Sequence, residues 1–148
     1  MARKRRRAWR IVGGWTATGA PLDAHAAALF AILFLWQIPH FLALGWIYRE
    51  DYARAGIRLL SSDDADGRAT FRQAALNAAA LVPVSLAPAA LAMAGWAYAA
   101  AALALSTALL VVAIAAARAP SVPHARRLFL ATLAYLPALL GVLVVRLP

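Results

Sequence analysis

Long apolar stretches alternate with short charged segments along this chain. Each stretch is close to the length of about 20 residues that a helix needs to cross a bilayer. Alanine and leucine dominate these stretches, and none shows the alternation of polar and apolar positions that marks an outer-membrane strand. The pattern predicts an all-α membrane protein with about four transmembrane helices. They are expected over residues 24–47, 74–94, 96–117 and 128–145 of a membrane domain at 24–148.

The connections between these stretches predict how the helices thread the membrane. The second and third stretches meet at Gly95 with almost no loop, which predicts an antiparallel hairpin. The other two connections, residues 48–73 and 118–127, are rich in arginine, and alternate crossing places both on one side. Because arginine-rich loops stay on the cytoplasmic side, we expect the loop at 48–73 to be cytoplasmic. The chain is then a multi-pass protein of a bacterial-type inner membrane.

Residues 1–23 do not fit this threading. The basic run Arg3–Arg7 favours the cytoplasm, yet a single crossing separates it from the arginine-rich loop. The stretch from Arg10 to Ala24 is too short to provide another crossing. Either the N-terminus lies outside against its charge, or residues 1–23 are a basic N-terminus with the remnant of a shortened helix.

The amino-acid composition excludes several classes of protein and of site. The 148 residues are 64% hydrophobic with a net charge of +9. A soluble domain needs more polar surface than this, so the lipid bilayer is the expected surrounding. No basic surface interleaved with aromatic residues accompanies the charge, which argues against a nucleic-acid partner. The absence of cysteine excludes disulfides, thiolate metal sites and a cysteine nucleophile within this sequence.

Candidate chemistry gathers at the end of the first apolar stretch. If the helix continues past the membrane surface, the left-handed conformation that Gly56 favours is a natural way to end it. Five residues then share one helix face at spacings of three and four. They are Gln37, His40, Leu44, Tyr48 and Asp51. A carboxylate at the membrane surface, with arginines nearby, suits Mg²⁺ and a diphosphate, and an apolar cavity behind it suits a lipid tail. One aspartate is a small metal site, so we expect a second carboxylate cluster elsewhere.

Simpler interpretations stand beside these. Residues 49–51 also fit an ordinary solvated helix end whose charges set the topology. His40 follows Pro39 and can donate a hydrogen bond to a carbonyl that the proline leaves free. The aspartates at 63, 64 and 66 fit an acidic turn better than a metal cluster, because their spacing departs from that of a calcium-binding loop.

Two segments of this region are familiar. Residues 35–44 (LWQIPHFLAL) and 48–57 (YREDYARAGI) resemble the heme O synthase (protoheme IX farnesyltransferase) branch of the UbiA-type prenyltransferases, and Arg126–Phe129 also fits. The resemblance covers nearly the whole chain but only the C-terminal half or so of the family's length. It implies the C-terminal part of a nine-helix bundle that transfers a farnesyl group from farnesyl diphosphate to heme b, with Mg²⁺.

The resemblance also implies roles for individual residues. Asp51 takes the place of the aspartate in the family's second diphosphate motif, where it binds Mg²⁺-diphosphate and serves catalysis. Arg49 and Arg54 neutralise the leaving group, and His40 lines the cavity. Tyr48, Tyr52 and Gln37 complete the substrate-binding set.

Three departures qualify the resemblance. After Ile57 the family reads Pro-Met-Leu-Pro, whereas Arg58-Leu59-Leu60-Ser61 follows here. The family's first motif, rich in Asn and Asp, has no counterpart in this sequence. Residues 11–19 resemble the two ends of one family helix joined without its middle. Two hypotheses follow. One is a heme O synthase-like prenyltransferase that is incomplete in this chain, with a separate N-terminal half as its candidate partner. The other is a non-catalytic four-helix membrane module, either a relic or a subunit that needs a partner.

Overall fold

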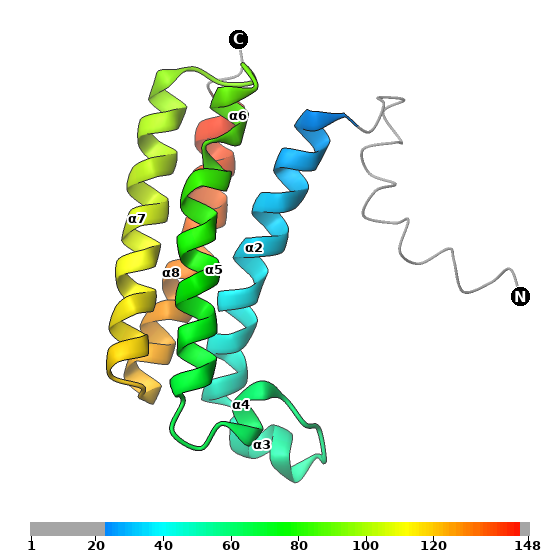
Figure 1. Cartoon of the computed structure of the whole chain (residues 1–148), viewed down its shortest axis with the longest axis vertical. Coiled ribbons are helices and arrows are strands. Elements are labelled where there is room, and N and C mark those ends of the chain that lie inside the picture. The colour runs from blue at the N-terminus through cyan, green and yellow to red at the C-terminus, as the bar shows by residue number, and fades with distance from the viewer. Residues whose placement is uncertain (1–22, 146–148) are drawn as a thin grey trace, which may run out of the picture.

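Four long helices form an antiparallel bundle in the computed structural model, which describes residues 23–145 without the side chain of Ser62 (Figure 1). They are α2 (Ala24–Ile47), α5 (Arg68–Ser85), α7 (Trp96–Arg118) and α8 (Val122–Val145). The short helices α3 (Arg49–Arg54), α4 (Leu60–Asp63) and α6 (Ala87–Ala90) lie in the connections. Four helices, counting α5 with α6 as one span, are long and apolar enough to cross a membrane. The prediction of an all-α membrane protein is confirmed.

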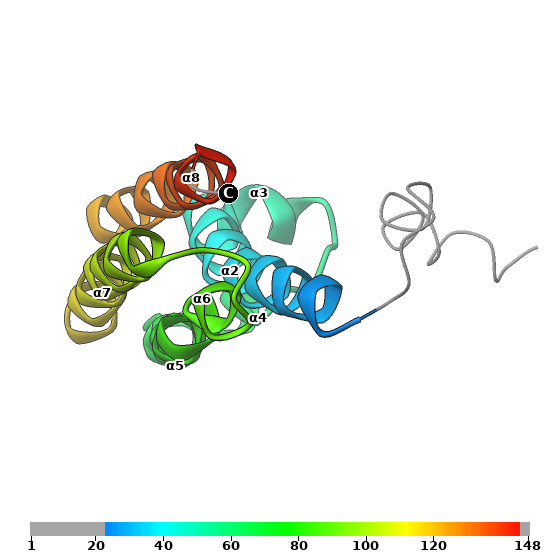
Figure 2. The same cartoon turned by 90° about the horizontal axis from the view of Figure 1, so that it is seen from above.

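Each long helix packs against two others, so the bundle is a ring of four. Helix α2 contacts α5 and α8, and α7 contacts the same two helices from the other side (Figure 2). Residues 1–22 lie outside the described residues, and the expected helix remnant there stays a prediction.

Small side chains form much of the helix interfaces. Within residues 23–145, seven alanines have no exposed surface: Ala43, Ala74, Ala78, Ala102, Ala113, Ala116 and Ala125. Small residues let helix backbones approach closely, which is how helices associate in lipid, where apolar burial gives little driving force. Buried hydroxyls bond to nearby carbonyls: Ser106 donates to Ala102 O at 2.6 Å, and Tyr98 donates to Ser85 O at 2.9 Å.

Helix ends differ from the expected ranges where charged residues extend a helix beyond the apolar stretch. Helix α5 begins at Arg68 rather than 74, and α8 begins at Val122 rather than 128. Prolines 39, 83 and 137 lie inside helices, as expected in a membrane. The stretch predicted to run from 74 to 94 is divided, because α5 ends at Ser85 and α6 follows with Pro88.

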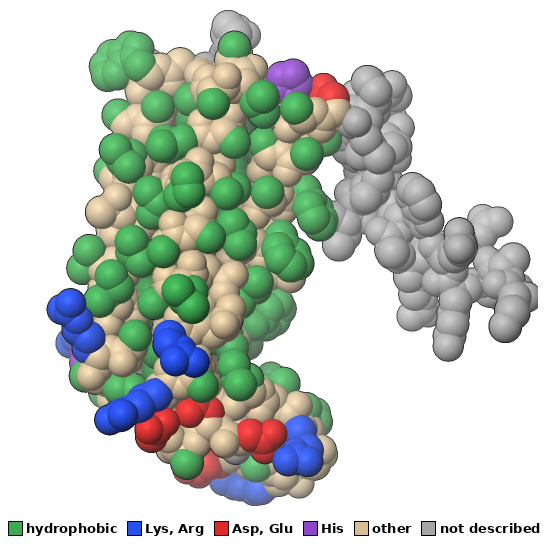
Figure 3. All heavy atoms as spheres, viewed as in Figure 1, with side chains coloured by type: hydrophobic (Ala, Val, Ile, Leu, Met, Phe, Trp, Pro, Cys, Tyr) green, Lys and Arg blue, Asp and Glu red, His purple; other side chains and the backbone are tan. Residues whose placement is uncertain are grey.

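The two ends of the bundle have different character. Helices α6 and α7 join at one end through residues 91–95, where Ala92 has a φ of 58°, and Trp96 there is 85% exposed. At the other end, Arg, Asp and Glu side chains gather around α3, α4 and the start of α5 (Figures 1 and 3). Both arginine-rich connections therefore lie at one end, as the threading predicted.

Candidate functional site

The segment that carries the predicted site is a short helix set off from α2 by Tyr48. Tyr48 has φ −105° and ψ 20°, so α2 ends at Ile47 and α3 begins at Arg49. Backbone bonds continue through the break, from Tyr48 N to Leu44 O and from Tyr52 N to Tyr48 O, both 3.1 Å. The expected single helix is therefore interrupted at the membrane surface, but its hydrogen bonding is nearly continuous.

Gly56 ends α3 in the left-handed conformation, as predicted, with a φ of 71°. Ile57 N donates to Tyr52 O at 2.9 Å, and Gly56 N donates to Ala53 O at 3.1 Å. This pair of bonds is a Schellman motif, which satisfies carbonyls at the end of the helix. The motif segment is thus a defined turn of helix rather than a loose loop.

A cavity of about 470 Å³ opens beside this segment, between α2 and α8. Its lining residues are Leu44, Ile47, Tyr48, Asp51, Val122, Arg126, Phe129 and Leu130. Asp51 and Arg126, which are far apart in the sequence, supply its charge, and the other lining residues are largely apolar. The predicted face of Leu44, Tyr48 and Asp51 is brought together here, and Arg126 is a wall residue that the helix pattern did not single out.

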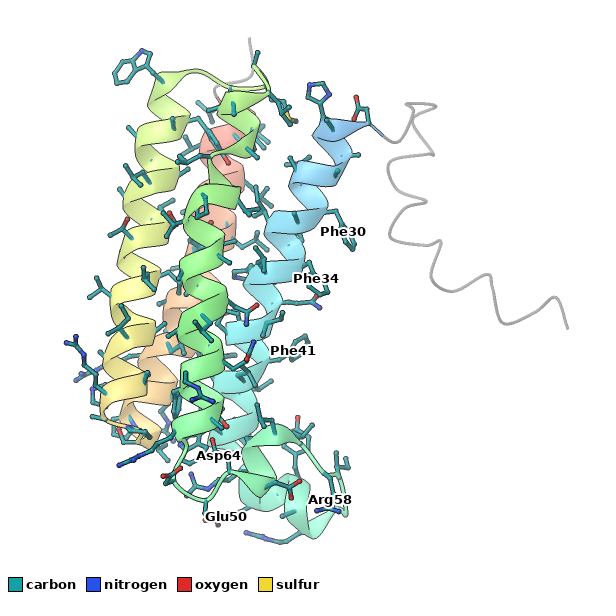
Figure 4. All side chains as sticks on the ribbon, viewed as in Figure 1. Phe30, Phe34, Phe41, Glu50, Arg58 and Asp64 are labelled. Carbon is teal, nitrogen blue, oxygen red and sulfur yellow. The ribbon has the colours of Figure 1, made fainter. Side chains whose placement is uncertain are left out.

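Arg54 is the cation nearest to Asp51 among the described ion pairs. Its guanidinium lies 3.7 Å from Asp51 and 3.8 Å from Glu50, one helix turn away. All three side chains are at least 66% exposed, so these contacts are weak and Arg54 can reorient toward an incoming anion. Figure 4 shows Glu50 at the tip of the molecule, on the helix that carries Asp51.

Arg49 lies elsewhere. Its guanidinium stacks over the Trp46 ring, 4.1 Å from the ring centroid, and Trp46 packs edge-on against Phe71 of α5. The structure therefore does not bring Arg49 to the cavity that Asp51 lines. Arg126 of α8 lines that cavity together with Asp51. The α8 residues that line the cavity follow helix spacing: Val122, Arg126 and Phe129. Their shared face could be predicted only with the knowledge that α8 begins at Val122.

His40 lies deeper, seven residues or about 10 Å along α2 from its end at Ile47, and Asp51 lies beyond that end on α3. Its ring stacks between Trp36 and Phe129, with centroids 5.1 and 4.9 Å away. His40 Nδ1 is 2.9 Å from Thr132 Oγ1, and that hydroxyl donates its proton to Phe129 O at 2.6 Å. In the neutral ring Nδ1 must therefore carry the proton, which leaves Nε2 as an acceptor. The partner is Thr132, not a carbonyl freed by Pro39.

Phe129 connects the two parts of the site. One side of its ring stacks on His40, and the residue also lines the cavity of Asp51 and Arg126. Trp36 Nε1 donates to Thr132 O at 2.7 Å, which fixes the same region of α8 to α2. A continuous series of side chains thus leads from the charged mouth to the mid-membrane histidine.

Tyr52 and Gln37 take different positions. Tyr52 lines a neighbouring cavity of about 450 Å³ together with Leu44, Tyr48, Asp51, Ala55 and Ile57. Gln37 is exposed on α2, outside the cavities described.

The aspartates of the 63–66 turn have structural partners. Asp63 pairs with Arg58 at 3.3 Å, Asp66 pairs with Arg68 at 3.3 Å, and Asp64 accepts the Thr70 N–H at 2.6 Å. These contacts support the interpretation as an acidic turn that leads into α5.

The donor set fits magnesium only in part. Within residues 23–145, no three residues of the His, Cys, Asp or Glu types come together as a metal group. Asp51 is the one carboxylate that lines the α2–α8 cavity. Mg²⁺ keeps several waters and often takes one or two protein carboxylates with the rest from phosphate, so Asp51 suits one ligand of a metal-diphosphate.

The fold and the site define a multi-pass helical membrane protein with a charged cavity at one membrane face. Residues 7–143 match the family model described as "UbiA prenyltransferase family". The chain belongs to this family, which confirms the resemblance seen in the two motif segments.

Three relatives of the chain carry the same name. A protoheme IX farnesyltransferase of Koribacter versatilis is 47% identical over 137 residues, 88% of this chain and 44% of the relative. One from Anaeromyxobacter sp. (strain Fw109-5) is 47% identical over 126 residues, 85% of this chain and 42% of its own length. One from Opitutus terrae is 36% identical over 133 residues, which are 89% of this chain and 45% of the relative. The chain thus spans less than half the length of these relatives. No solved structure matches it significantly.

Proposed function

We propose that this chain contributes the second diphosphate site of a heme O synthase-like prenyltransferase, which transfers a farnesyl group from farnesyl diphosphate to heme b. The observation that carries the proposal is the cavity between α2 and α8, which places Asp51 and Arg126 at the mouth of an apolar space. The name protoheme IX farnesyltransferase, which relatives of the chain carry, supplies the farnesyl group and the heme acceptor.

The residues at the mouth suit a departing diphosphate. In this proposal Arg126 and the mobile guanidinium of Arg54 stabilise its charge, and the Tyr48 hydroxyl donates a hydrogen bond. Asp51 would hold the magnesium ion, which supplies positive charge to the leaving oxygen. The allylic C–O bond breaks and diphosphate leaves. The farnesyl carbon then bonds to the terminal carbon of a heme vinyl group, and water adds to the resulting cation with loss of a proton, which gives a hydroxyethylfarnesyl side chain.

The apolar walls suit the remaining parts of the substrates. Leu44, Ile47 and Leu130 would contact the prenyl chain, and Phe129 leads from them to His40. Exclusion of water there protects a developing allylic cation. His40, held by Thr132, would position heme or prenyl chain rather than the metal. We further propose that the site faces the cytoplasm of a bacterial inner membrane, because the arginine-rich connections lie at this end.

A pair of neighbouring carboxylates provides the test. Glu50 and Asp51 contact the same arginine, but only Asp51 lines the α2–α8 cavity. The chain is expressed with an N-terminal half of the Koribacter versatilis relative in a host that lacks heme O synthase, and heme O is measured. Asp51→Asn should remove most heme O, at least about a hundredfold by analogy with other electrostatic groups. Glu50→Gln should retain it. Equal activity of the two variants at equal membrane levels would refute the role of Asp51.

The single carboxylate favours a second candidate, a non-catalytic four-helix membrane module that is either a relic or a subunit that needs a partner. The same host separates the two: these 148 residues are expressed alone and with the N-terminal half in trans. Heme O only with the added half supports a split site. Heme O from the chain alone shows that one carboxylate suffices, and none in either case supports the non-catalytic module.

A further inference from the structure

A second charged cavity lies at the same end of the bundle, between α5 and α7. It measures about 630 Å³. Its lining residues are Asp64, Asp66, Arg68, Ala69, Arg72, Ala117, Arg118 and Pro120. None of them lines the Asp51 cavity, which is formed by α2, α3 and α8. The proposed prenyl transfer therefore leaves this cavity without a role.

The charges of this cavity are unevenly paired. Arg68 pairs with Asp66 at 3.3 Å, and Asp64 accepts the Thr70 N–H at 2.6 Å. Among the residues that the structure describes, no carboxylate lies within ion-pair distance of Arg72 or Arg118. The three arginines and two aspartates of the lining leave one positive charge in excess. Two guanidinium groups from different helices are thus available to one anion.

Apolar surface continues from each of these arginines toward the bilayer core. Leu76 lies one helix turn from Arg72 on α5 and is 59% exposed. Val111 lies two turns from Arg118 on α7 and is 60% exposed. Spacings of four and seven residues keep each pair on one face of its helix. A ligand with a charged head at the arginines would therefore have its apolar part against these helices.

We propose that the α5–α7 cavity binds the phosphate of an anionic phospholipid, with the acyl chains along the faces of Leu76 and Val111. Basic pockets between transmembrane helices bind anionic lipid headgroups. Guanidinium groups match phosphate oxygens in bidentate geometry, and the excess charge of the cavity equals that of a phosphodiester. Arginines at the ends of membrane helices lie at the depth of lipid phosphates.

Lipid retention on the purified full chain tests the site without any enzyme assay. The protein in detergent is mixed with phosphatidylglycerol or phosphatidylcholine, and retained lipid is measured by native mass spectrometry. Phosphatidylglycerol should be retained preferentially. Arg72→Gln and Arg118→Gln should each weaken retention about fivefold, as one arginine near an anionic surface does. Arg127→Gln removes the same charge at the same membrane face but lines neither cavity, so it should retain the lipid. Arg72→Lys keeps the positive charge but lacks the bidentate guanidinium. It should therefore lose less phosphatidylglycerol retention than Arg72→Gln.

Three results would overturn the proposal. Equal retention of the two lipids would show that no charged site selects them. An equal loss in Arg127→Gln would show diffuse attraction rather than a site. The lipid-free protein could instead bind inorganic phosphate and lose this binding in Arg72→Gln. If phosphatidylglycerol is also not retained, the cavity binds a soluble anion rather than a lipid. Circular dichroism of each variant confirms that its helices are intact before retention is compared.

Discussion

At the scale of single residues, Thr132 sets the orientation of His40. Its one hydroxyl proton goes to Phe129 O, so its oxygen accepts from His40 Nδ1. Thr132→Val keeps the shape but removes this acceptor, and should cost about 1 kcal/mol of unfolding free energy. Thr132→Ser should restore it. Nitrogen NMR of the histidine should show Nδ1 protonated in the wild type and in Thr132→Ser, and a mixed tautomer in Thr132→Val. An unchanged spectrum in Thr132→Val would contradict this orientation.

Asp64 should contribute a pH-dependent part of the stability. Partial burial acts to raise its pKa, but hydrogen bonding led by the Thr70 backbone N–H prevails and holds the pKa of Asp64 below its ordinary value. A lowered pKa in the folded state means that the contribution is present above the unfolded pKa, about 3.9, and is lost as pH falls through the folded value.

Asp64→Asn isolates this contribution. The melting temperature of the wild type should fall more than that of Asp64→Asn as the pH is lowered from about 5 to 3, the interval around and below the unfolded pKa. Asp63→Asn serves as the control for a neighbouring exposed carboxylate. Parallel melting curves for wild type and Asp64→Asn across this range would contradict the coupling.

A residue's role could be predicted from the sequence when the pattern that points to it lies within one segment of the chain. It could not be predicted when the role depends on packing between helices. Asp51 was predicted from its helix face and its motif, both of which are contained within one segment of the chain. Arg49 belongs to the same motif, but its stacking on Trp46 depends on how Trp46 packs against Phe71 of a different helix. Arg126 shares a cavity with Asp51 only because α8 packs beside α2. Helix periodicity gives a direction around one axis, and the neighbour in that direction is set by tertiary packing.

At the scale of elements, two glycines end or begin helices with positive φ and differ in their surroundings. Gly56 has a φ of 71°, and a Cβ added there would meet no atom within 4 Å. Gly67 has a φ of 75°, and a Cβ added there would lie 2.7 Å from Trp46 Cη2. Gly56→Ala should therefore cost about 1 kcal/mol for the left-handed backbone alone. Gly67→Ala adds a clash with buried atoms and should cost about 3 kcal/mol.

Unfolding in mixed detergent micelles measures both costs. Comparing Gly56→Ala with Gly67→Ala removes the cost of the left-handed backbone, because φ is nearly the same at the two positions. Equal destabilisation by the two substitutions would show that Trp46 and Pro120 yield freely to a new methyl group near Gly67.

Helix existence was predictable from the sequence, and helix boundaries were less so. Apolar length found all four spans, since a bilayer demands it. The ends of α5 and α8 were missed because Arg68, Arg72 and Arg126 continue the helices into the interface, where hydropathy no longer reports on helix. The break at Leu86 was missed as well, because Pro83 and Pro88 are both compatible with helix by sequence, and only Pro83 lies inside α5.

At the scale of the whole molecule, the threading makes a direct prediction about sides. Because the chain has no cysteine, any introduced one is a unique label. Ala65 and Gly95 are both exposed and lie at opposite ends of the bundle. In intact spheroplasts a membrane-impermeant maleimide should label Gly95→Cys but should label Ala65→Cys only after permeabilisation. The reverse pattern would place the arginine-rich connections outside and refute the cytoplasmic assignment.

At the alanine-lined interfaces described above, the bundle tolerates substitution by a smaller residue better than substitution by a larger one. A core of leucine and phenylalanine loses most when side chains are cut back, because cavities form. Here Ala43, Ala78, Ala102 and Ala113 have only one methyl group to lose, so the harm of truncation is limited to the backbone freedom of glycine. Any larger residue at these positions must push two helices apart. Drift in such a protein is therefore free to change its lipid-facing surface while these alanine positions remain confined to the smallest side chains.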